Sequence, residues 1–115
     1  MKIVRLYTGE DGQSHFEELD LPWSTMANSQ DTAERRAIST KFLRQMPGFF
    51  NSFHPAPRRQ YVITLDGQVE IGIGDGTKRL FGAGDVMLAE DLTGQGHTTR
   101  VMGDRPRVSV WIPLA

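Results

Sequence analysis

The sequence predicts an all-β protein, a sandwich or barrel of short strands, from three observations. Turn residues recur about every 8 to 12 residues, which is the spacing typical of such folds. The segments between the turns alternate apolar and polar side chains, as half-buried strands do. No long stretch has the 3.6-residue period of an amphipathic helix. Twelve glycines and six prolines are consistent with a chain that turns often.

The N-terminal segments predict a β-hairpin. Residues 3–7 alternate, residues 10–13 contain the Asp-Gly pair that favours a tight turn, and residues 15–21 alternate again. Pro22 ends this second strand, because proline cannot donate to the ladder of hydrogen bonds.

The next segment is polar and irregular, from residue 24 to 34. Asp31 is a suitable N-cap for a short helical turn over residues 32–36. Residues 37–42 predict another strand, and residues 46–48, Met-Pro-Gly, predict a turn.

The second half predicts a regular series of strands rich in β-branched and aromatic residues. The expected strands are residues 61–65, 69–73, 78–81, 86–89 and 108–112. The expected turns between them are residues 66–67, 75–76 and 82–85.

Composition narrows the function classes. The net charge is −1, from 13 basic and 14 acidic residues, so we expect neither a nucleic-acid partner nor an anionic membrane surface. No segment approaches the roughly 20 apolar residues of a membrane span, and residues 1–7 lack the apolar core of a secretion signal. The absence of cysteine excludes disulfides and thiolate sites and fits a cytoplasmic protein. The length predicts a single domain, residues 1–115.

One spacing in the middle of the chain resembles the first cupin motif. Gly48, His54, Gln60 and Gly67 stand where that motif has glycine, histidine, glutamate and glycine. The spacing matches throughout, but Gln60 replaces the glutamate and Ala56 replaces the second histidine.

A later segment resembles the second cupin motif. The Gly-Asp pair at residues 84–85 stands at its start, and Gly94 and His97 match its glycine and histidine. Leu92 stands at its proline, Val101 at its asparagine, and the loop is two residues longer than usual.

This resemblance implies a cupin-type barrel, a jelly-roll or double-stranded β-helix, over about residues 48–113, with short strands before it. Residues 54–61 and 90–97 look like those of small single-domain bacterial cupins. The resemblance also implies that His54 and His97 lie on neighbouring strands inside the barrel. It is fairly specific for the fold and weakly specific for an activity.

Strand periodicity adds further residues to the expected site. Residues two apart on a strand share a face, so Val62 faces the same way as Gln60, and Thr99 the same way as His97. We expect Gln60, Val62 and Thr99 to contact a small ligand, because a barrel of this size holds side chains and one small ligand.

In the family that the sequence resembles, three histidines and a carboxylate typically bind iron, manganese, nickel or zinc. His54, His97 and Gln60 are the remaining candidate ligands here. The neutral amide of Gln60 is a weak ligand, and open catalytic sites usually keep about three protein ligands. The sequence leaves a divalent metal as an open alternative.

Other residues carry weaker expectations. Glu90 and Asp91 can complete a metal shell, but we expect surface acids near the barrel mouth. Arg58 and Arg59 point to opposite faces of a regular strand, and Arg58 is a candidate for binding a carboxylate or phosphate. His15 is expected to be an ordinary hydrogen-bonded strand residue.

The aromatic residues are expected to fill the core or a dimer contact, with one or two lining the pocket. They are Trp23, Phe49, Phe50, Phe53 and Trp111.

Three hypotheses about function follow. The barrel is a metal-dependent isomerase, lyase or oxygenase of small molecules, a metal-free enzyme using His54 or His97 as general acid or base, or a ligand-binding or sensing module without catalysis. The sequence does not choose between the last two. We also expect a homodimer, with residues 3–7 as a candidate for strand exchange.

Overall fold

A computed structural model describes all 115 residues and contains twelve strands and no helix. The all-β prediction is confirmed. None of its elements is a helix that is long and apolar enough to cross a membrane.

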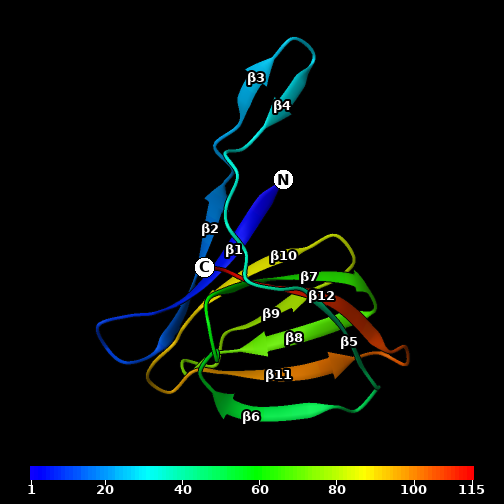
Figure 1. Ribbon diagram of the computed structural model, residues 1–115. Coiled ribbons are helices and arrows are strands. Elements are labelled where there is room, and N and C mark those ends of the chain that lie inside the picture. Colours follow the sequence, from blue (N-terminus) through cyan, green and yellow to red (C-terminus); the bar gives the residue numbers. More distant parts are fainter.

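Two sheets form the body of the molecule (Figure 1). The larger sheet has the strand order β2-β1-β10-β7-β12-β5, and only β1 and β10 pair in parallel. Its strands are β1 (Lys2–Thr8), β2 (Ser14–Asp20), β5 (Lys41–Gln45), β7 (Gln60–Asp66), β10 (Val86–Glu90) and β12 (Arg107–Pro113). The smaller sheet has the order β6-β11-β8-β9. Its strands are β6 (Phe50–His54), β8 (Gln68–Gly72), β9 (Lys78–Phe81) and β11 (His97–Met102).

The main core lies between these sheets. Alternation puts one face of each strand inside, so on β7 the buried residues are Gln60, Val62 and Thr64, with less buried residues between them. On β11 the same period buries His97, Thr99 and Val101. The aliphatic part of the core includes Leu6, Val62, Val69, Ile71 and Met87. The faces predicted for Gln60, Val62, His97 and Thr99 are therefore confirmed.

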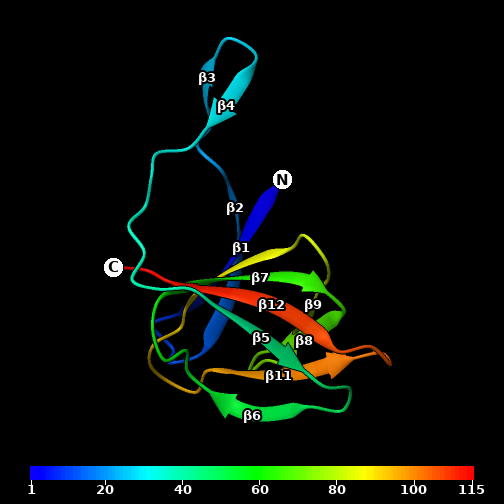
Figure 2. The same ribbon diagram turned by 45° about the vertical axis from the view of Figure 1, so that its right-hand side comes forward.

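A third, two-stranded sheet stands apart from the barrel. It is a hairpin of β3 (Ser24–Met26) and β4 (Ser29–Asp31), and it projects away from the barrel in both ribbon views (Figures 1 and 2). Ala27, at φ 54°, sits in its turn.

The sequence prediction is wrong in this region. Residues 32–36 were expected to form a helical turn, but they have no regular secondary structure. They form the connection that leads from the hairpin back to the barrel (Figure 2). The strand expected at residues 37–42 lies later, at β5, and Ala37 makes only an isolated bridge to Leu114. Residues 32–42 contain few apolar side chains, so the sequence pattern did not define where the strand begins.

Candidate functional site

A cavity opens between the two sheets, beside the paired ends of β6 and β11. Its volume is about 80 Å³. Pockets for drug-sized ligands measure roughly 300 to 1,000 Å³, so the enclosed part admits a small molecule or one end of a larger one. Its polar lining residues are Gln45, Asn51, His54, Gln60, His97, Thr99 and Arg107. Its apolar lining includes Phe49, Ala56, Val62, Ile71, Met87, Ala89 and Trp111.

His54 and His97 face each other across the β6–β11 ladder. They are register partners, and their ring centroids are 4.5 Å apart. The register shifts between His97 and Thr99, which marks a local irregularity next to the pair. The expectation that these two histidines lie together inside the barrel is met by this pairing.

The His54 ring is held by its own strand. Its Nδ1 lies 2.7 Å from the Ser52 carbonyl oxygen. A carbonyl oxygen only accepts hydrogen bonds, so Nδ1 is the donor, and in the neutral ring Nε2 carries the lone pair. The tautomer of His54 thus follows from the backbone of β6.

The His97 ring is held by a buried carboxylate. Its Nδ1 lies 2.6 Å from Asp91 Oδ2, and the same oxygen accepts a hydrogen bond of 2.7 Å from the Ser14 hydroxyl. His97 is 5% exposed and Asp91 is completely buried. The other carboxylate oxygen of Asp91, Oδ1, is buried without a partner. This arrangement fixes the ring and leaves Nε2 as the free nitrogen of a side chain that lines the cavity.

The β10–β11 loop places Asp91 behind the histidines. The Ala56 amide donates to the Asp91 carbonyl at 2.9 Å, which ties this loop to the segment after His54. Gly96, at φ 78°, passes against the His54 backbone so closely that a Cβ atom would overlap it. Only glycine combines this positive φ with this close approach.

The expectation that Asp91 is a surface acid is wrong, because the loop turns its carboxylate inward onto His97. Glu90 is mostly buried at the barrel edge, where it forms ion pairs with Arg5 at 3.3 Å and Arg59 at 3.0 Å. Neither acid lines the cavity.

Arg107 is a site residue that the sequence interpretation missed. It is 3% exposed, and it lines the cavity from the start of β12. Its Nε and Nη2 donate to Thr64 Oγ1 at 3.3 and 3.1 Å, and Nη1 donates to Gln45 Oε1 at 3.0 Å. Burial lowers the pKa of Arg107 to about 10, which still leaves it a cation at neutral pH.

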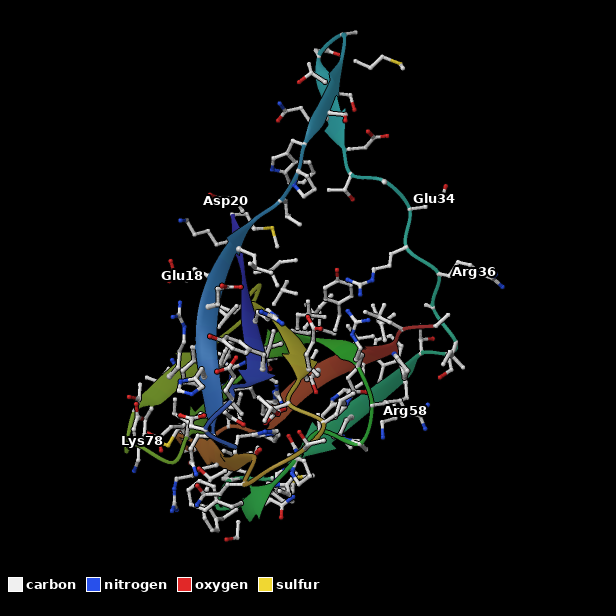
Figure 3. All side chains as sticks on the ribbon, turned by 90° about the vertical axis from the view of Figure 1, so that its left-hand side faces the viewer. Glu18, Asp20, Glu34, Arg36, Arg58 and Lys78 are labelled. Carbon is white, nitrogen blue, oxygen red and sulfur yellow. The ribbon has the colours of Figure 1, made fainter.

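The structure separates the other expected site residues into two groups. Gln60, Val62 and Thr99 line the cavity, and the Gln60 amide makes no hydrogen bond to either histidine. Arg58 does not join them, because it lies in the loop before β7, is exposed and points away from the barrel (Figure 3). His15 also lies outside the cavity, with Nε2 bonded to Asp11 at 2.9 Å.

The five aromatic residues fall into two groups, and Trp111 also packs against the main core. Phe49 and Trp111 line the cavity. Trp23, Phe50 and Phe53 are exposed to 47%, 47% and 43%. Strand position explains this, since β6 is an edge strand and Trp23 leads into the projecting hairpin.

The residues present do not fit a resident divalent metal. Two imidazoles remain, Ala56 supplies a methyl group, and no three His, Cys, Asp or Glu side chains lie together. The Asp91 carboxylate is bonded to His97 Nδ1 and lies outside the cavity lining. Arg107 adds a positive charge to the same cavity, which repels a second cation.

Comparison with known proteins supports the fold. No family model matches this chain, and no curated protein sequence matches it. A double-stranded β-helix domain protein from Klebsiella pneumoniae superposes with a TM-score of 0.53 at 20% identity, over 70% of this chain and 75% of its own.

Two further solved structures have similar barrels. The cupin domain of Cnp3 from Schizosaccharomyces pombe gives a TM-score of 0.54 at 12% identity, over 89% of this chain and 73% of its own. The dTDP-6-deoxy-D-glucose-3,5-epimerase RmlC from Legionella pneumophila gives a TM-score of 0.51 at 9% identity, over 97% of this chain and 72% of its own. With its strand order and its paired histidine strands, this chain therefore has the cupin fold, a double-stranded β-helix.

Proposed function

We propose that the cavity is a metal-free acid–base site for a small molecule, in which His97 acts as the general base. The observation that carries this proposal is the buried 2.6 Å hydrogen bond from His97 Nδ1 to Asp91, with the opposite ring edge available to the cavity. Proton removal next to a carbonyl is the reaction type, which corresponds to isomerase or lyase chemistry.

Each group has a defined part in this step. The lone pair on His97 Nε2 takes a proton from a carbon of the bound molecule, and the electron pair of the broken C–H bond moves into the adjacent carbonyl. The imidazolium that forms is stabilised by the Asp91 carboxylate at Nδ1. Return of the proton to another carbon of the conjugated enolate, or to the opposite face of the same carbon, completes an isomerisation.

His54 and Gln60 serve the ligand in this proposal. His54 Nε2 offers an acceptor to a hydroxyl group, because Nδ1 is already bonded to Ser52. The Gln60 amide can donate to the carbonyl that receives the electron pair. The apolar lining from both sheets keeps bulk water from the reacting carbon.

Solvent exchange tests this function without knowledge of the substrate. A panel of small ketones, aldehydes, hydroxy acids and oxo acids is incubated with the protein in D₂O, and deuterium incorporation is followed by NMR. We expect exchange in at least one compound, its loss in His97→Ala, and its retention in His15→Ala, whose histidine lies outside the cavity. Compounds that bind without exchange would favour the alternative, a ligand-binding or sensing module.

Metal content is tested separately. Protein purified without an affinity tag is measured by elemental mass spectrometry after incubation with iron, manganese, nickel and zinc. We expect no stoichiometric metal in the wild type or in His54→Ala. One metal ion per chain that disappears in His54→Ala would contradict the metal-free proposal.

A further inference from the structure

The charge of Arg107 has no counterpart inside the protein. Its three hydrogen bonds all go to neutral acceptors, the Thr64 hydroxyl and the Gln45 amide. None of the ion pairs of the chain includes Arg107. Arginine is rarely buried without a partner, because removal of its charge from water is strongly unfavourable.

The surrounding acids are already engaged elsewhere. Asp91 bonds His97 and Ser14, Glu90 pairs with Arg5 and Arg59, and Asp66 pairs with Arg105. No carboxylate lines the cavity that Arg107 faces. The cation is therefore free to meet an anion that enters from outside.

The guanidinium has free donors for an oxyanion. It has five N–H donors, of which three are used, so one donor remains on each of Nη1 and Nη2. Two donors on adjacent terminal nitrogens match two oxygens of a carboxylate or of a phosphate in a bidentate pair. The cavity of about 80 Å³ also favours a compact anion.

We propose that Arg107 is the anion-binding residue of this cavity and that its ligand is a small carboxylic acid, held through its carboxylate at the Arg107 end with its reactive carbon toward His97. This inference rests on the proposed function only for the placement of the reactive carbon at His97; binding of the carboxylate by Arg107 does not depend on it. It makes Arg107 a ligand-binding residue and gives the acid–base site an oxo or hydroxy acid as its substrate class.

The experiment measures anion binding without catalysis. Acetate, pyruvate, lactate and oxalate are titrated at constant ionic strength, while NMR follows the Nε–H resonance of Arg107, with chloride and inorganic phosphate as comparison anions. We expect a saturable shift with at least one carboxylate at millimolar concentration. Binding measured by calorimetry should be about 10- to 100-fold weaker in Arg107→Gln.

Three variants separate the possible outcomes. Arg58→Gln, at an exposed arginine outside the cavity, should bind like the wild type. His97→Ala should also keep the carboxylate, so retained solvent exchange in this variant, with carboxylate binding intact, would contradict the proposed function and leave the role of Arg107 standing. Arg107→Lys keeps the charge but not the two parallel donors, and should bind with intermediate affinity even if Arg107→Gln does not fold.

Two results would overturn the inference. One is the absence of any carboxylate-dependent shift at Arg107 in the wild type. The other is tighter binding of phosphate than of every carboxylate, which would assign the site to a different class of anion.

Discussion

In the proposed acid–base site, Asp91 acts through His97 and not on a ligand, and a single substitution tests this role. Asp91→Asn keeps the size of the side chain but removes the charge that stabilises an imidazolium at Nδ1. We expect the rate of solvent exchange to fall by about 10²- to 10⁴-fold, and ¹⁵N NMR to show a mixture of His97 tautomers. Glu90→Gln, at the neighbouring acid outside the cavity, is the control and should retain the rate. An unchanged rate in Asp91→Asn would make Asp91 a purely structural residue.

Arg107 predicts an unusual pH dependence of ligand binding. Burial lowers its pKa to about 10, and carboxylate binding requires the protonated form. Affinity for the carboxylate should stay level up to about pH 9 and fall by about tenfold per unit above pH 10. Calorimetry across this pH range measures the affinity for the carboxylate, and circular dichroism checks that the protein stays folded. Affinity that is unchanged at pH 11 would contradict the role of the guanidinium.

The same pKa fixes the sign of the stability effect in the ligand-free protein. At pH values between the lowered pKa of about 10 and the higher, ordinary pKa of arginine, the unfolded chain holds the Arg107 proton and the folded chain does not. The contribution of this group to the free energy of unfolding therefore rises with pH in that window. The sign shows that burial of the Arg107 cation is unfavourable in the folded, ligand-free protein.

Residue spacing predicted one part of the site and missed another. His54, Gln60 and His97 were found because the spacing of two motifs fixed their strands and their inward faces. Asp91 was misjudged because it lies in a loop, where no period tells which acids turn inward. Arg107 had a usable signal, since it is in phase with the buried Ser109 on β12.

At the scale of elements, the β10–β11 loop holds the two histidines in register. Gly96→Ala would add a Cβ atom in a left-handed conformation and against the His54 backbone. We expect a loss of about 2 to 4 kcal/mol in the free energy of unfolding, together with loss of ligand binding. Urea denaturation measures the first quantity and calorimetry the second.

Gly76→Ala is the matched control for this loop. Gly76 also has a positive φ, 89°, but a Cβ atom there would meet nothing within 4 Å. Gly76→Ala should lower the free energy of unfolding by only about 1 kcal/mol, from the strained backbone conformation, and should leave ligand binding unchanged. Equal losses in the two variants would mean that the close approach to His54 has no energetic role.

The strands that sequence patterning predicted well share a clear physical property. From β7 onward, Gly-containing or Asp-Gly turns separate the strands, and β7 and β11 alternate buried and less buried side chains, while β10 is a short apolar run buried on both faces. The hairpin of β3 and β4 has no such signal, because all six of its strand residues are exposed. Without a buried face, neither its existence nor its register could be inferred.

At the scale of the whole molecule, the outer face of the larger sheet is apolar. A second cluster, made of Ile3, Val86, Leu88 and Leu114 with flanking Leu19, Tyr61 and Ile63, lies apart from the main core. A groove of about 650 Å³ runs over this face, between the strands and the connection at residues 32–35. The four central residues of this cluster are buried, and the groove leaves the flanking Leu19, Tyr61 and Ile63 partly exposed. An apolar groove of this kind on a folded protein is a candidate interface.

The projecting hairpin points to the same conclusion. An isolated two-stranded hairpin is marginally stable in water, so β3 and β4 need a surface to pack on. Its apolar tip residue Met26 is 82% exposed, and Trp23 at its base is 47% exposed. We propose that a second copy of the chain covers the outer face and that the hairpin of each copy packs against the other copy in a two-fold symmetric dimer.

Strand exchange of β1 is not required for this dimer. β1 already pairs with β2 and, in parallel, with β10 of its own chain. The sequence expectation of a homodimer thus stays a proposal, with the outer face and the hairpin as its interface in place of an exchanged strand.

Sedimentation analysis tests the dimer at micromolar concentration. The wild type should sediment as a dimer, and Ile63→Asp, on the outer face, should sediment as a monomer because the interface would have to bury a charge. Leu80→Asp is the control, since Leu80 is 54% exposed on β9 of the other sheet and should leave the dimer intact. A wild type that is monomeric under these conditions would leave the apolar face without a self-partner. Retained carboxylate binding in a folded, monomeric Ile63→Asp would then show that the cavity is complete within one chain.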